Sequence, residues 1–127
     1  MIKTFVIALI FFCIIDVFWI YFVVTPMYKQ EVASLMQLKI APAILFYIIF
    51  LVGLIFFVIN PNHGNTLVNV FMIGAFYGLV TYATYDLTVY ATMNIFSLKL
   101  VVADILWGMI LSGSVATLTV LTTAKLN

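Results

Sequence analysis

Four long apolar segments take up almost the whole of this sequence and severely limit its fold. They cover residues 4–24, 41–59, 67–90 and 98–121. About 20 apolar residues suffice to cross a bilayer as an α-helix, which satisfies its own backbone hydrogen bonds in lipid. Charged residues make up 7% of the chain, against about 25% in soluble domains. We therefore predict an all-α, polytopic membrane protein, a four-helix bundle forming a single membrane domain over residues 1–127.

The joins between the predicted spans are short and polar. Residues 27–39 are amphipathic and predict a short helix lying on the membrane interface. The run Asn60-Pro61-Asn62-His63-Gly64-Asn65 is dense in helix-breaking residues and predicts a turn. An even number of spans places both termini on one side of the membrane. The lysines are spread too evenly over the two sides to decide which side that is.

Composition also limits the partners of the chain. It has five lysines, no arginine and four acidic residues, so it offers no basic surface for nucleic acid. Its one cysteine, Cys13, has no second cysteine for an internal disulfide. The lipid bilayer is the one partner that the sequence requires. A homodimer or a membrane partner is compatible with it.

Three aspartates, Asp16, Asp86 and Asp104, lie inside the apolar spans. An ionisable residue in a span costs about 2.5–3.5 kcal/mol on insertion scales, so each marks a candidate functional position. Counting about 1.5 Å of helix rise per residue puts all three roughly 6–12 Å below the face with the first linker and third loop. Tyr47 falls at the same depth. We therefore predict one polar layer to which every helix contributes a side chain.

Small residues accompany the aspartates at intervals of four along the last two spans. The two stripes are Gly74, Gly78, Tyr82, Asp86 and Tyr90 on the third span and Asp104, Gly108, Ser112 and Ala116 on the fourth. Small residues at this spacing let helix backbones approach closely in lipid. The stripes therefore predict that the last two spans pack against each other, with their aspartates together at one end.

The predicted polar site combines carboxyl, phenol and indole groups. Its candidate members are Asp16, Asp86, Asp104, Tyr47, Tyr82, Tyr85 and Trp107. Our leading hypothesis is a membrane protein that handles a small molecule, a lipid or protons at this site. His63 belongs to the turn, and a lone histidine in a turn is usually solvated surface.

Two alternatives remain open at the level of the sequence. The protein would be a membrane enzyme acting on a lipid or isoprenoid, with an aspartate as base and a tyrosine as proton donor. Metal assistance would then use Asp16, Asp86 and Asp104 to bind Mg²⁺ or Mn²⁺, although the sequence requires no cofactor. Otherwise it would be a structural or accessory subunit, with each aspartate paired to a threonine, tyrosine or lysine.

Several motifs, taken together, resemble a known family. They are IDVFWI (15–20), the polar linker after Pro26, YATYDLT (82–88) and LKLVVADILWG (98–108). Over essentially its whole length the chain resembles the small bacterial membrane proteins of domain-of-unknown-function family 2177. The resemblance implies a multi-pass protein of the bacterial inner membrane and brings no established activity. It singles out Asp16, Asp86, Asp104 and Trp107.

The chain departs from that family's pattern at two places. In the family, an asparagine usually follows the YDLT motif, whereas this chain has Val89. The family's third loop often holds Trp-Pro, where this chain has Phe96-Ser97. A contribution of that asparagine to binding would therefore be absent here.

The mutation Asp86→Asn tests whether the carboxyl groups serve a site or the fold. The change keeps the side-chain volume and removes the ionisable group. If the carboxyl serves a site and not the fold, the variant should still fold. We expect Asp86→Asn to insert and accumulate like the wild type, measured by quantitative immunoblotting of washed membranes. Loss of accumulation in both Asp86→Asn and Asp104→Asn would instead mark the carboxyls as structural.

Overall fold

The computed structural model describes residues 2–19, 21–22, 40–94 and 97–126. Within these ranges the chain is helical apart from short turns, and no strand occurs there. The helices are α1 (Ile2–Trp19), α3 (Ile40–Leu54), its continuation as η2 (Ile55–Ile59) and η3 (Asn60–Asn62), α4 (Leu67–Thr92) and α5 (Leu98–Leu126). In this described part, four helical stretches are long and apolar enough to cross a membrane. The predicted all-α, four-span architecture is therefore confirmed.

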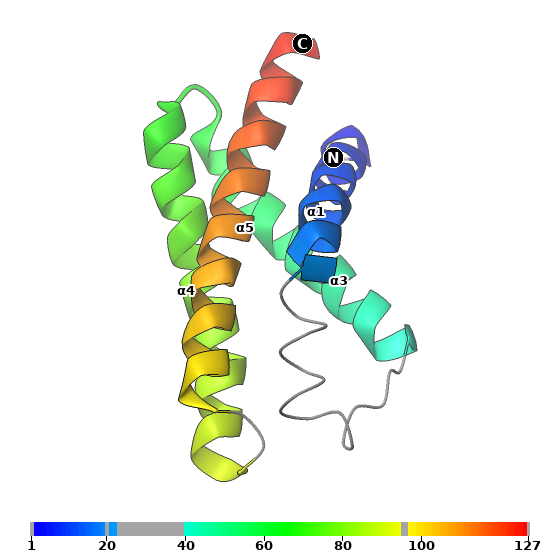
Figure 1. Ribbon diagram of the computed structural model, residues 1–127. Helices are drawn as coiled ribbons and strands as arrows, with labels where there is room; N and C mark the ends of the chain where they lie inside the picture. The colour runs from blue at the N-terminus through cyan, green and yellow to red at the C-terminus, as the bar shows by residue number, and fades with distance from the viewer. Residues whose placement is uncertain (1, 20, 23–39, 95–96, 127) are drawn as a thin grey trace.

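The helices form a bundle around α5 (Figure 1). α4 and α5 run antiparallel side by side, and α1 lies against α5. α3 crosses obliquely and contacts α1, while η2 contacts α4 and α5. The start of α1 and the end of α5 lie at the same end of the bundle, as an even number of spans predicts. The interfacial helix predicted for residues 27–39 falls outside the described residues.

The turn between η3 and α4 is built from its own polar side chains. Asn62 Nδ2 donates a hydrogen bond of 2.6 Å to the Val58 carbonyl oxygen at the end of η2. Gly64 has a φ of 89°, a left-handed conformation that glycine adopts without steric cost. Thr66 then caps α4, because its Oγ1 accepts from the backbone N–H of Asn69 at 3.2 Å. The turn lies where its residues predict it.

α3 continues into a widened helical turn, η2, just after the residues that Tyr77 of α4 contacts. The Tyr77 hydroxyl of α4 donates to the Phe50 carbonyl oxygen at 2.9 Å. Gly53 allows this approach, since a Cβ there would meet the same hydroxyl group. The next segment, η2, is a π-helical turn in which the N–H of Asn60 reaches the Ile55 carbonyl. Side chains that insert into the backbone ladder commonly accompany such distortions.

The closest packing in the bundle joins α4 to α5. A Cβ on Gly74 would lie 2.9 Å from the Gly113 Cα, and a Cβ on Gly78 would overlap the Gly108 carbonyl. Ser112 Oγ would be only 2.7 Å from that Gly78 Cβ. The two predicted stripes therefore do face each other, and glycine is required where the backbones touch.

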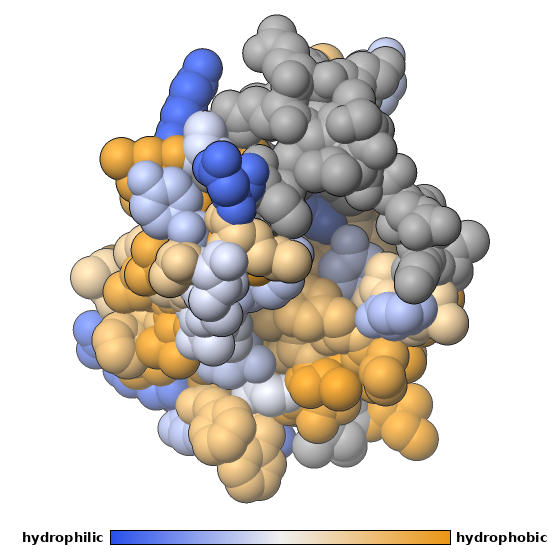
Figure 2. Space-filling model, turned by 90° about the horizontal axis from the view of Figure 1, so that it is seen from below, coloured by the Kyte–Doolittle hydropathy of each residue, from blue (hydrophilic) through white to orange (hydrophobic). Residues whose placement is uncertain are grey.

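The core of the bundle is apolar and so is most of its outer face. The buried core contains Ala8, Phe12, Phe50, Leu51, Leu54, Ile55, Val58, Ile59, Val70, Leu111, Val115, Ala116 and Val120. Large apolar side chains also cover the outward faces of the helices, as lipid contact requires. Figure 2, which views the bundle from below, shows hydrophobic side chains over much of the coloured surface.

The mutation Gly78→Val tests the contact between α4 and α5. We expect a loss of about 1–3 kcal/mol in the free energy of unfolding, because added methyl groups overpack a tight interface. Unfolding of the purified protein in lipid–detergent micelles by sodium dodecyl sulfate measures this loss. Ala91→Val is the control, because Ala91 is exposed on the same helix and should tolerate the change. Equal losses in both variants would contradict the assigned interface.

Candidate functional site

Asp16 joins α1 to two other helices. Its side chain is buried, with 9% of its surface exposed. The Tyr47 hydroxyl of α3 donates to Asp16 Oδ2 at 3.3 Å, and Trp107 Nε1 of α5 donates to Asp16 Oδ1 at 3.3 Å. Each carboxyl oxygen thus has its own donor from a different helix. Buried polar groups with partners on neighbouring helices hold those helices together.

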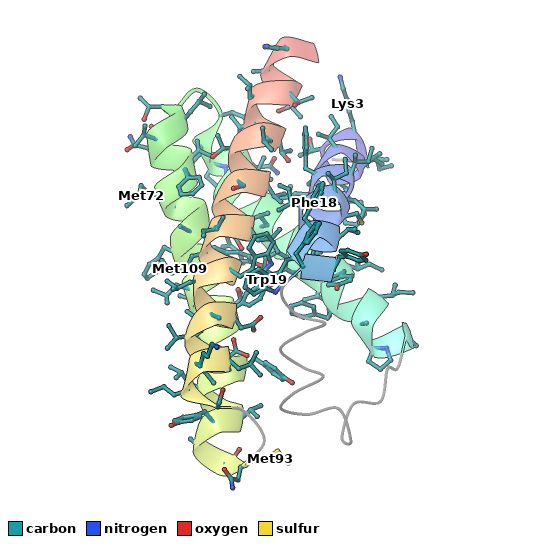
Figure 3. The ribbon with its side chains drawn as sticks, in the orientation of Figure 1. Lys3, Phe18, Trp19, Met72, Met93 and Met109 are labelled. Carbon is teal, nitrogen blue, oxygen red and sulfur yellow. The ribbon has the colours of Figure 1, made fainter. Side chains whose placement is uncertain are left out.

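Aromatic rings enclose this Asp16 cluster. Trp19 of α1 and Trp107 stack with ring centroids 4.6 Å apart and an angle of 4° between their planes. Figure 3 shows Trp19 at the lower end of α1, between α1 and α5. Phe12 packs edge-on against Tyr47 with a centroid distance of 5.0 Å. The candidate set missed Trp19 and Phe12, although the paired Asp-x-x-Trp motifs on two antiparallel helices carried a signal for Trp19.

Asp86 and Asp104 form a second cluster, between α4 and α5. Their carboxyl groups lie close to each other and interact directly. Asp86 is 1% exposed, and its Oδ2 has no hydrogen-bond partner among the described residues. Asp104 is half-buried. The two carboxyls meet because the glycines further along α4 and α5 bring these helices together.

A cavity of about 260 Å³ lies beside this carboxyl pair, between α3, α4 and α5. Among the described residues, Phe46, Thr81, Tyr82, Tyr85 and Asp104 line it. Phe46 and Tyr85 are its most exposed members, at 46% and 60%. Asp104 is the one ionisable carboxyl among the lining residues that the structure describes. The cavity is therefore a mainly aromatic space with a carboxyl group in its wall.

Tyr82 lies between the two clusters. Its ring packs directly over Gly108, so that any Cβ at Gly108 would overlap the ring. Tyr82 interacts electrostatically with Asp16 and Asp104 as well as with Asp86. It also lines the cavity. The position of this ring therefore depends on a glycine in the small-residue stripe of α5.

The structure divides the predicted polar layer into two adjacent groups. Asp16, Tyr47 and Trp107 form the first group, and Asp86, Asp104, Tyr82 and Tyr85 form the second. In the described ranges, no three His, Cys, Asp or Glu side chains are arranged to hold a metal ion. The three aspartates hypothesised as a metal set are therefore not assembled as one there.

The threonine hydroxyls of α4 form their hydrogen bonds within α4. Thr84, Thr88 and Thr92 each donate to the backbone carbonyl four residues earlier in α4. Thr81 likewise donates to the Tyr77 carbonyl oxygen, at 2.9 Å. These hydroxyls are therefore satisfied within their own helix.

The fold and the site define a multi-pass membrane protein with carboxyl groups inside the bundle. The chain belongs to the family described as predicted membrane protein (DUF2177), whose model matches residues 1–121. This confirms the family that the motifs indicated. No curated protein matches the chain, and no solved structure does.

A double-mutant cycle on Tyr47 and Asp16 tests the first cluster. We expect Tyr47→Phe to lose stability in the wild type and to have little effect beside Asp16→Ala, because the hydroxyl then has no acceptor. The coupling energy should be about 0.5–1.7 kcal/mol, the range found for hydrogen bonds between membrane helices. Unfolding by sodium dodecyl sulfate measures all four proteins. A coupling energy near zero would show that this hydrogen bond does not hold the helices together.

Proposed function

We propose that the protein binds a small amphiphilic molecule within the membrane, in the cavity between α3, α4 and α5. One observation carries this proposal: the aromatic cavity and the carboxyl pair share a residue, Asp104. Binding sites for small molecules are mostly apolar spaces with a few placed polar groups. The aromatic lining would hold an apolar body, and Asp104 would hold a polar end.

The burial of Asp86 supports the same proposal. Asp86 is 1% exposed, and its Oδ2 has no hydrogen-bond partner among the described residues. Such burial of a carboxyl costs free energy in an apolar bundle. A purely structural carboxyl would be expected to acquire full hydrogen bonding, as Asp16 does from Tyr47 and Trp107. We therefore assign Asp16 to helix cohesion and the pair of Asp86 and Asp104 to function.

Proton handling is a second candidate function, and the same carboxyl pair favours it. Two neighbouring carboxyls in a poorly solvated place would hold a proton that a ligand or a change in pH can displace. Release of that proton on ligand binding would combine both functions at one site. An enzyme acting on a lipid or isoprenoid stays a prediction of the sequence.

The membrane in which the protein resides and its assembly are also matters of proposal. We propose that the chain resides in the bacterial inner membrane, the location that its family resemblance implies. A single membrane domain over residues 1–127 and a homodimer or membrane partner stay predictions.

Infrared difference spectroscopy tests the proposed binding directly. The purified protein in lipid nanodiscs is titrated with three probes of matched shape: 2-phenylethanol, 2-phenylethylamine and 3-phenylpropionate. We expect at least one probe to shift a carboxyl band saturably, because a bound polar end would contact Asp104. The Asp104→Asn spectrum identifies that band.

Two threonine variants locate the response. Thr81→Trp should abolish it, because an indole at this lining position would occupy the cavity. Thr84→Trp should preserve it, because Thr84 is exposed on the same helix and is not part of the lining. No saturable response to any probe would reject the proposed function. Equal responses in both variants would place binding elsewhere.

A further inference from the structure

We infer that the ligand of this cavity is an amphiphilic organic monocation, an amine or quaternary ammonium group attached to an apolar body. The inference rests on the proposed function and narrows it to one chemical class of ligand. Three features of the lining carry it: its charge, its aromatic rings and its size.

The charge of the lining favours a cation. Asp104 faces the cavity, and none of the lining residues in the described part of the chain is a lysine, arginine or histidine. Two carboxyls this close repel each other when both are ionised, so an ionised Asp104 beside a protonated Asp86 would give the pair a single negative charge. A monocation would neutralise this charge, whereas an anion would repel it. A neutral ligand would leave the charge without a counterion in a poorly solvated place.

The rings of the lining favour an organic cation. Phe46, Tyr82 and Tyr85 supply three of the five lining side chains in the described part of the chain. The face of an aromatic ring attracts ammonium groups, and cages of such rings bind quaternary ammonium ligands. A hard divalent metal ion would instead require several oxygen ligands around it. Thr81 also belongs to the lining, and its hydroxyl donates within its own helix.

The size of the cavity limits what it encloses. Its volume of about 260 Å³ lies below the range of about 300–1,000 Å³ typical of drug-sized ligands. The cavity therefore fits an ammonium group and a short apolar segment rather than a whole lipid. A longer tail would leave past Phe46 and Tyr85, the most exposed lining residues.

The test compares the binding of a cation with that of its neutral counterpart. 2-Phenylethylamine, benzyltrimethylammonium and 2-phenylethanol are titrated into the protein in nanodiscs of phosphatidylcholine, and empty nanodiscs give the partition background. Equilibrium dialysis measures the free concentration of each probe. We expect both cations to bind about 10-fold or more tightly than the alcohol, given the worth of a desolvated cation on aromatic rings.

Two variants assign that preference to the lining. Asp104→Asn should reduce the ratio of cation to alcohol affinity to near one while alcohol binding persists. Tyr85→Leu should weaken the cations about 5-fold more than it weakens the alcohol, because the alcohol has no cation–π attraction to lose. Phe76→Leu is the control, since Phe76 is 62% exposed on α4 and outside the lining. Should Asp104→Asn not fold, Tyr85→Leu decides.

The outcomes separate this inference from the proposed function. Equal binding of cation and alcohol to the wild type, or a preference that survives both variants, would overturn the inference and leave the cavity a site for neutral amphiphiles. Tighter binding of 3-phenylpropionate than of either cation would overturn it as well. Failure of every probe to bind would reject the proposed function itself.

Discussion

The close approach of α4 and α5 is the contact on which the rest of the site depends. Helices in lipid gain little from the hydrophobic effect, so their association relies on packing and hydrogen bonds. Gly74 and Gly78 meet the α5 backbone with no room for a Cβ, and Gly108 accommodates the Tyr82 ring. This packing places Asp86 against Asp104 and puts Tyr82 beside them. A wider spacing of the two helices would separate the carboxyls and reshape the cavity.

The three aspartates have different surroundings, so the cost of burying each carboxyl is offset in a different way. Asp16 has a phenol and an indole as donors, with stacked tryptophans beside it. Asp86 lies next to the Asp104 carboxyl, and its Oδ2 has no hydrogen-bond partner among the described residues. Asp104 adjoins both that carboxyl and a cavity. For Asp16, hydrogen bonds between helices offset the cost of burying the carboxyl. For Asp86 and Asp104, we attribute the presence of a buried carboxyl to ligand binding.

Much of the fold follows from local properties of the sequence. α4 and α5 begin at residues 67 and 98, the predicted starts of their spans, because polar residues end the apolar runs there. The glycine stripe of α4 was also predictable, since a spacing of four keeps residues on one helix face. The π-helical turn after Leu54 was not, because it follows the contact of α3 with Tyr77 from a different helix. The sequence did not indicate that Phe46 lines the cavity, because Phe46 is one exposed aromatic residue among many.

The sequence by itself indicated the four spans, and it predicted the depth at which each aspartate lies. Depth depends only on the rise per residue along one helix, which is the same for every helix. Only the tertiary structure decided which groups meet: Asp16 with Trp107 and Tyr47, and Asp86 with Asp104 beside the cavity. These pairings depend on how each helix is rotated about its axis and which helix lies next to it. Rotation and neighbours are set by packing between residues far apart in the chain, and a single apolar span holds too little information to specify them.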